Sequence, residues 1–163
     1  MRFSSILSLA FAAVAMTAPA SLAARTDEGC VPVSYTISDY KLVTSATSGS
    51  VDFTFKSSFS RSDNDDPVQN GVHCGGSGAS VPNNNECQVA DRRLLFDLRG
   101  PQDQAYYQIS HSWTCSGNQW ISGTAVKVDS LNCYTEGDKR VCTGGPQTFA
   151  PQNPRKICNS PQC

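Results

Sequence analysis

The amino-acid sequence predicts an all-β protein: a single antiparallel β-barrel or β-sandwich, cross-linked by disulfides and carrying long polar loops. Three observations support this fold class. Apolar and polar residues alternate in several segments, the chain of 163 residues contains eight cysteines, and no segment sustains the period of an amphipathic helix. Turns containing Gly and Asn separate the alternating segments, as is typical of antiparallel hairpins.

The first 23 residues have the three parts of a secretory signal peptide. Arg2 supplies a positive charge, residues 6–16 form an apolar core, and small residues follow up to Ala23. The apolar core is too short to span a membrane. We therefore expect a signal peptide over residues 1–23, cleaved after Ala23 or Ala24, and a secreted, extracellular protein.

The remaining chain predicts one β domain over residues 24–144, followed by a Pro-rich, disulfide-linked C-terminal tail over residues 145–163. The chain contains 13 Lys and Arg against 14 Asp and Glu, which gives a formal net charge of −1. A nucleic-acid-binding protein normally shows a basic patch or stripe, so this balance argues against such a partner. Outside the N-terminus no apolar run is long enough for a membrane span.

Period-two alternation predicts the strands. The clearest strand covers residues 50–59, where Val51, Phe53 and Phe55 share one face and polar residues share the other. The other regular segments are residues 105–115, 119–129, 131–135 and 139–143. A Ser-Gly-Asn turn separates the first two of these and a Glu-Gly-Asp turn the last two, so we expect two hairpins.

Two further segments are less regular. Alternation begins at residues 33–37 and resumes at Tyr40 with the opposite parity, so we expect a β-bulge near Asp39. Residues 94–99 alternate as a strand, although helical spacing over residues 85–96 is an alternative. We favour the strand because its surroundings are β.

Two polar segments between strands, residues 61–71 and residues 75–85, are long for loops in a compact domain. Such loops are typically functional or mobile. We expect binding to occur through loops carried on the scaffold, with these two as the first candidates.

All eight cysteines follow the signal peptide: Cys30, Cys74, Cys87, Cys115, Cys133, Cys142, Cys158 and Cys163. An even number in an exported chain indicates disulfides. Structural zinc is the rival interpretation, but it usually requires Cys-x-x-Cys pairs, which the sequence lacks. We expect no metal and no cofactor.

Proximity in the sequence favours three bonds, Cys74–Cys87, Cys133–Cys142 and Cys158–Cys163. Cys30 and Cys115 then remain, and they either bond to each other or engage another chain. The chain is accordingly expected to be a monomer or a disulfide-linked dimer through Cys30.

Two histidines are the candidate catalytic residues of the sequence. His73 and His111, with Glu86 and a nearby arginine, are the residue types of a ribonuclease-like acid–base pair. However, His111 lies on the apolar face of its expected strand, where a histidine is commonly a hydrogen-bonded core residue. We therefore favour a non-enzymatic protein with no catalytic residue and keep a small secreted hydrolase that uses His73 and His111 as the alternative.

Two other motifs carry less weight. Residues 75–79 resemble a nucleophile elbow around Ser77, but the fifth position is Ala and no strand-to-helix pattern flanks them. Asp63, Asp65 and Asp66 lack the glycine and distal glutamate of an EF-hand, so a solvated acidic loop is favoured over a calcium site.

The order of features resembles a known family. A cysteine and Val31-Pro32-Val33 lead into residues 35–40 (YTISDY), a polar turn and then residues 51–55 (VDFTF). This is similar to the opening of the Alternaria-type major-allergen family, small secreted fungal β-barrels. The pairs Cys74/Cys87 and Cys133/Cys142 match its two intrachain bridges, and Cys30 matches its dimer-linking cysteine. The resemblance extends to Cys142; three cysteines and the tail after Gly144 are extra.

This resemblance implies a non-enzymatic β-barrel secreted by a plant-associated fungus. Members of such families act as allergens, as elicitors of plant defence, or as effectors that bind host proteins. We therefore expect an effector or elicitor whose partner is a host plant protein or cell-surface component. A secreted hydrolase is the second hypothesis, and a structural wall or coat protein is the third.

Overall fold

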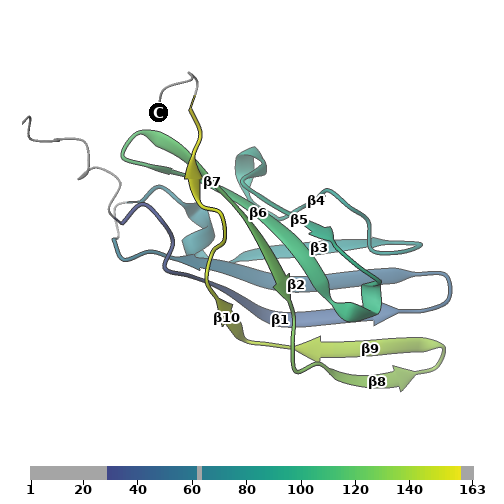
Figure 1. Cartoon of the computed structure of the whole chain (residues 1–163). Helices are drawn as coiled ribbons and strands as arrows, with labels where there is room; N and C mark the ends of the chain where they lie inside the picture. The colour runs from purple at the N-terminus through teal and green to yellow at the C-terminus, as the bar shows by residue number, and fades with distance from the viewer. Residues whose placement is uncertain (1–28, 62–63, 159–163) are drawn as a thin grey trace, which may run out of the picture.

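The computed structural model describes residues 29–61 and 64–158, which form two antiparallel β-sheets (Figure 1). The first sheet has the strand order β3-β2-β1-β9-β8, with β10 also paired to β1, and the second has the order β11-β7-β6-β5-β4. No α-helix occurs among these residues, and none of their helical segments has the length and hydropathy of a membrane span. The all-β fold class is confirmed. The expected signal peptide, residues 1–23, lies outside the described residues.

The strands are β1 (Ser34–Thr44), β2 (Gly49–Ser58), β3 (Val72–Gly78), β4 (Asn85–Glu86), β5 (Leu94–Leu98), β6 (Tyr106–Cys115), β7 (Asn118–Lys127), β8 (Asn132–Glu136), β9 (Lys139–Gly144), β10 (Gln147–Phe149) and β11 (Arg155–Lys156). Three 3-10 turns connect them: η1 (Pro67–Asn70), η2 (Ala90–Arg92) and η3 (Gln102–Gln104). The long β6–β7 hairpin crosses over the sheet that β1, β2 and β3 form (Figure 1).

Both expected hairpins are present. Cys115 pairs with Asn118 across the β6–β7 turn, and Glu136 pairs with Lys139 across the β8–β9 turn. In the first turn Ser116 and Gly117 have φ angles of 50° and 74°. Positive φ at both central residues is the conformation that matches the twist of a two-residue hairpin, and Gly117 adopts it without steric cost.

The bulge expected near Asp39 is confirmed. The pairing of β1 with β2 shifts register between Ser38 and Lys41, and Asp39 has a φ angle of 55°. The shift returns Tyr40 to the buried face that Ile37 occupies before the bulge, so both halves of β1 contribute to the core. An extra residue in one strand has this effect because side chains alternate strictly between faces.

The strand expected over residues 94–99 is present as β5, which pairs with β6. The helical alternative over residues 85–96 is therefore wrong. The expected loop over residues 75–85 is partly wrong. Its glycines belong to β3, whose pairing with β2 runs from Val72 to Gly78. A Cβ on Gly76 would collide with the side chain of Asn85. The glycine is therefore explained by close packing between strands and not by a loop.

The residues after Gly144 return to both sheets. Gln147–Phe149 pair with Tyr35–Ile37 of β1, on the edge that β9 occupies farther along the same strand. Arg155 and Lys156 pair with Ile121 and Trp120 of β7. The division into a domain of residues 24–144 and a tail of residues 145–163 stays a prediction, but the described part of that tail adds one strand to each sheet.

The core lies between the sheets and is rich in aromatic side chains. Tyr40 and Phe53 from the first sheet face Phe96 and Tyr107 from the second, and all four are buried. The hydroxyl groups of Tyr40 and Tyr107 are hydrogen-bonded at 2.7 Å, which joins the sheets through a polar contact inside an apolar core. Burial raises the pKa of Tyr107 to about 12, and burial together with Tyr107 raises that of Tyr40 further.

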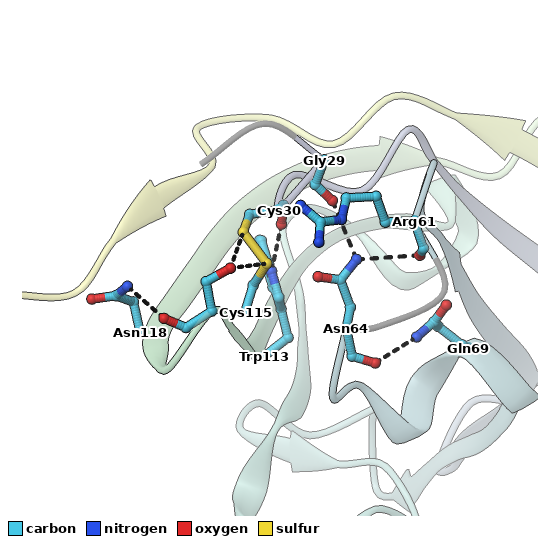
Figure 2. The surroundings of a disulfide bond; sticks show 9 residues. Gly29, Cys30, Arg61, Asn64, Gln69, Trp113, Cys115 and Asn118 are labelled. Carbon is cyan, nitrogen blue, oxygen red and sulfur yellow. Dashed lines mark hydrogen bonds between the residues drawn. A yellow bond between two sulfur atoms is a disulfide. The ribbon is translucent and has the colours of Figure 1, made fainter. Parts of the chain in front are cut away.

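Three disulfides connect cysteines that both belong to the described residues. Cys74–Cys87 joins β3 of the first sheet to the residue after β4 of the second, and Cys133–Cys142 links directly opposed residues of the β8–β9 hairpin. Cys163 lies outside the described residues, so the Cys158–Cys163 bond stays a prediction. Figure 2 shows the third bond, Cys30–Cys115, which closes within the chain. The sulfur of Cys30 therefore does not link a second chain here, contrary to the dimer that the family resemblance implied.

A second, smaller apolar cluster surrounds Cys30–Cys115. It contains Trp113 and Trp120, whose rings stack at a centroid distance of 6.3 Å. The indole N–H of Trp113 donates to the carbonyl oxygen of Cys30 at 2.7 Å (Figure 2). The disulfide and this hydrogen bond fasten the N-terminal end of the described chain to the end of β6.

Candidate functional site

A polar hollow of about 290 Å³ lies beside the Cys74–Cys87 bond, where β2, β3 and β4 meet. Its lining includes Asp52, His73, Ser77, Glu86 and Gln88. The alternation of side chains along β2 and β3 places Asp52 and His73 on the outer face of the sheet. His73, for example, lies between the buried residues Val72 and Cys74. The N–H of Gln88 donates to the carbonyl oxygen of His73 at 2.8 Å and holds the two sides of the hollow together.

Asp52 and His73 form a pair on this outer face. The Nε2 atom of His73 lies 3.2 Å from Oδ1 of Asp52, and the side chains are 47% and 55% exposed. Gly75 faces Asp52 in the strand register, and a Cβ there would lie 3.0 Å from the carboxylate and 3.2 Å from the imidazole. The glycine therefore leaves the space that this pair occupies.

A second charged pair closes the hollow on the β4 side. The Nε atom of Arg92 lies 2.8 Å from Oε1 of Glu86, and both side chains are more than half exposed. Exposed ion pairs contribute little to folding, typically about 0–1 kcal/mol. The lining of the hollow consequently presents two carboxylates and an imidazole to solvent, and the guanidinium of Arg92 lies beside it on Glu86, a set suited to hydrogen bonding with a polar partner.

His111 has a different environment, because it is fully buried between the sheets. Its Nε2 atom lies 3.2 Å from Oδ1 of Asp66, and its Nδ1 atom lies 3.0 Å from the hydroxyl of Tyr35. Tyr35 in turn is hydrogen-bonded to the hydroxyl of Ser122 at 2.6 Å. Both ring nitrogens thus have partners, as buried polar groups require.

The carboxylate of Asp66 is the acidic centre of this network. It accepts hydrogen bonds from the hydroxyl of Ser57 and from the N–H of Val68, which it caps at the start of η1. Burial by itself would raise the pKa of Asp66, but the hydrogen bonds and the charge of His111 outweigh burial and hold the pKa below its ordinary value. The network therefore stabilises an ionised carboxylate inside the protein.

The two histidines of the hydrolase hypothesis do not share a site. His73 lies on the outer face of the first sheet, whereas His111 lies in the interior between the sheets. The sheet itself separates the two rings. Within the described residues, no hydrogen bond connects His73 with Ser50 or Ser77, the two serines that line its hollow. A ribonuclease-like pair made of these two rings is thus not assembled.

The segment of residues 61–71, the other candidate loop, borders a cleft of about 540 Å³ that Asp65, Asp91 and Arg93 help to line. Asn64 holds its start: the side-chain amide donates to the carbonyl oxygens of Gly29 and Arg61 at 3.2 and 3.4 Å (Figure 2). Among the residues the structure describes, no group of three His, Cys, Asp or Glu side chains is placed to hold a metal ion.

Sequence reasoning missed the partners of both histidines. Asp52 is one of the polar residues of the strand predicted over residues 50–59, and its cross-strand diagonal position relative to His73 is the signal that could have identified the pair. Asp66 belongs to the segment expected as a solvated acidic loop, and it is instead buried against His111. No local pattern indicates that contact, because 45 residues separate the two.

Comparison with solved structures finds a similar protein, the Alternaria alternata allergen Alt a 1. The TM-score is 0.51 at 12% sequence identity, and the match covers 86% of this chain and 99% of the allergen chain. The chain has the fold of this allergen. The resemblance noted in the sequence is thereby confirmed at the level of the fold. No protein-family model and no curated protein matches the sequence.

Proposed function

We propose that this chain is a secreted, non-enzymatic effector or elicitor that binds a host plant component and triggers or modulates defence. The fold it shares with Alt a 1 supports this proposal, as does the set of disulfides, which form and persist in oxidising, extracellular compartments. The partner is a host protein or a component of the host cell surface.

The observation that carries the proposal is the position of the exposed polar groups. Asp52, His73 and Glu86 line one hollow, directly beside the disulfide that links the two sheets, and Arg92 forms an ion pair with Glu86 at its edge. A rigid scaffold that presents such groups loses little conformational freedom on binding, which favours affinity. We assign the binding surface to this hollow, called here the His73 hollow.

The test is infiltration of the purified mature protein into leaf tissue, combined with a pull-down from plant extract. The wild type should trigger a defence response and capture a plant component. The double variant His73→Ala/Glu86→Ala should lose both effects. Lys56→Ala, which alters an exposed residue of β2 outside the hollow, should keep both.

Hydrolysis of RNA and of polysaccharide is measured on the same samples. Activity that is present in the wild type and lost in His73→Ala would favour the secreted hydrolase over the proposed effector. A wild-type protein that gives neither a defence response nor a captured component would contradict the effector proposal.

A further inference from the structure

A second hollow, of about 320 Å³, lies on the outer face of the other sheet and has a different chemistry. Its floor spans two paired strands: Ser110 of β6 and Gly123 of β7 are register partners. Arg99, which follows β5, and Arg155 of β11 line it from opposite sides, because the sheet order is β11-β7-β6-β5. We call this the arginine hollow.

Neither arginine of this hollow forms an ion pair with an acid of the described residues. Within the described part of the chain, Arg99 and Arg155 take part in no ion pair, and the lining contains no Asp or Glu. Asp97 faces Gln108 in the strand register and so stands at the edge of the hollow, but it is not part of the lining, and its carboxylate accepts a hydrogen bond from the N–H of Asn84. Two exposed arginines thus line one hollow on a protein whose formal net charge is −1.

The groups between the arginines are neutral hydrogen-bonding side chains. Arg99 donates to the carbonyl oxygen of the Gln108 side chain at 3.3 Å, which leaves the amide hydrogens of Gln108 for a ligand. Asn153 donates to the backbone carbonyl of Gly123 at 3.3 Å and keeps its own carbonyl oxygen as an acceptor. Gly123 has no side chain, and the amide nitrogen of Gln108 lies over it, 3.2 Å from where a Cβ would stand, so this donor forms part of the floor.

We propose that the arginine hollow binds an acidic oligosaccharide, one whose sugars carry carboxylates, such as an oligomer of galacturonic acid. Arginine recognises carboxylates through paired N–H donors, while hydroxyl and amide side chains match the hydroxyl groups of a sugar. The N–H of Arg99 donates to the carbonyl oxygen of Tyr106 at the start of β6, whereas Arg155 is the partner of Ile121, which faces Ser112 six residues farther along β6. Three strand spacings of about 4.8 Å and six residues of about 3.3 Å place the two backbones roughly 25 Å apart. Two arginines at opposite ends of the hollow suit an oligomer that carries several carboxylates.

This site lies on the sheet opposite the His73 hollow, and its test uses purified components alone. Its outcome is therefore independent of any defence response and of the proposed function. The experiment is a nuclear magnetic resonance titration of the isotope-labelled mature protein with a galacturonic acid oligomer, and the fitted shifts give the dissociation constant.

We expect shifts concentrated at Ser110 and Gly123. Arg99→Gln and Arg155→Gln should each weaken binding about tenfold, as loss of one charge-assisted contact does. Arg140→Gln removes the same charge from an exposed residue of the β8–β9 hairpin and should leave binding unchanged. Raised salt should weaken binding because both guanidinium groups are exposed.

Four results would overturn the proposal. These are the absence of binding, equal binding of the neutral methyl-esterified oligomer, equal effects of Arg140→Gln and Arg155→Gln, and binding of inorganic phosphate or an oligoaspartate as tight as that of the sugar. The last result would identify a general anion or acidic-peptide site instead.

Discussion

His111 and Asp66 form a fully buried pair in which Nε2 of the histidine lies 3.2 Å from Oδ1 of the aspartate. His111 belongs to β6 in the second sheet, and Asp66 immediately precedes η1. Because Asp66 also accepts from Ser57 of β2, the pair connects both sheets with the segment between β2 and β3. His111, a catalytic candidate in the hydrolase hypothesis, is therefore a buried residue that connects parts of the fold.

Loss of the Asp66 carboxylate should destabilise the fold strongly. Removing one partner of a buried pair leaves the other group uncompensated, which typically costs about 3–5 kcal/mol. We expect Asp66→Ala to lower the free energy of unfolding by about that amount, measured by urea denaturation. Asp65→Ala is the matched control, since that side chain is 78% exposed and its loss should change stability by less than about 0.5 kcal/mol. Equal effects of the two substitutions would contradict the assignment.

The same carboxylate should make stability depend on acid. The pKa of Asp66 in the folded protein lies below its ordinary value of 3.8. At low pH the unfolded chain therefore binds a proton more readily than the folded chain does. The contribution of Asp66 is present above the ordinary pKa and is lost as pH falls through the lower, folded-state pKa. Urea denaturation at a series of acidic pH values should show this fall in the wild type, and a clearly smaller fall in Asp66→Asn.

The parts of the fold that depend on a local sequence pattern could be predicted from the sequence. The parity change between Ile37 and Tyr40 requires an extra residue, so the bulge at Asp39 was predictable from β1 alone. The Ser-Gly-Asn and Glu-Gly-Asp turns likewise located two hairpins. The prediction of a loop was wrong at residues 75–78. A glycine that makes room for a neighbouring strand cannot be distinguished by sequence from a glycine in a loop.

The candidate site was less predictable, because it depends on contacts between distant segments. The position of His111 on an apolar strand face indicated a buried histidine, and the structure agrees. Its partners Tyr35 and Asp66 lie on other elements, and sequence spacing carries no information about them. The arginine hollow depends on β11 pairing with β7, whereas residues 145–163 were expected to form a tail.

The disulfides Cys30–Cys115, Cys74–Cys87 and Cys133–Cys142 should differ in their contribution to stability. In the chain-entropy model the stabilisation grows with the loop that the bond closes. The sequence separations are 85 for Cys30–Cys115, 13 for Cys74–Cys87 and 9 for Cys133–Cys142. We therefore expect double Cys→Ala variants to lose about 4.6 kcal/mol for the first bond and about 3 kcal/mol or less for the other two. Thermal unfolding of the three variants ranks these losses, and a largest loss at Cys133–Cys142 would refute the expected order.

The bulge at Asp39 offers a test of local backbone conformation. Its φ of 55° is in the left-handed region, where a β-branched residue is strained by about 1–2 kcal/mol. Asp39→Val should be less stable than Asp39→Gly by up to about 1.5 kcal/mol, as measured by urea denaturation, once the effect of glycine on the unfolded chain is subtracted. Both variants lose the exposed hydrogen bond from Ser38 to the Asp39 carboxylate, so their difference isolates the backbone effect. Glycine also increases the freedom of the unfolded chain, which reduces the difference by about 0.5–1 kcal/mol. If valine proved at least as stable as glycine, Asp39 would not hold this conformation in solution.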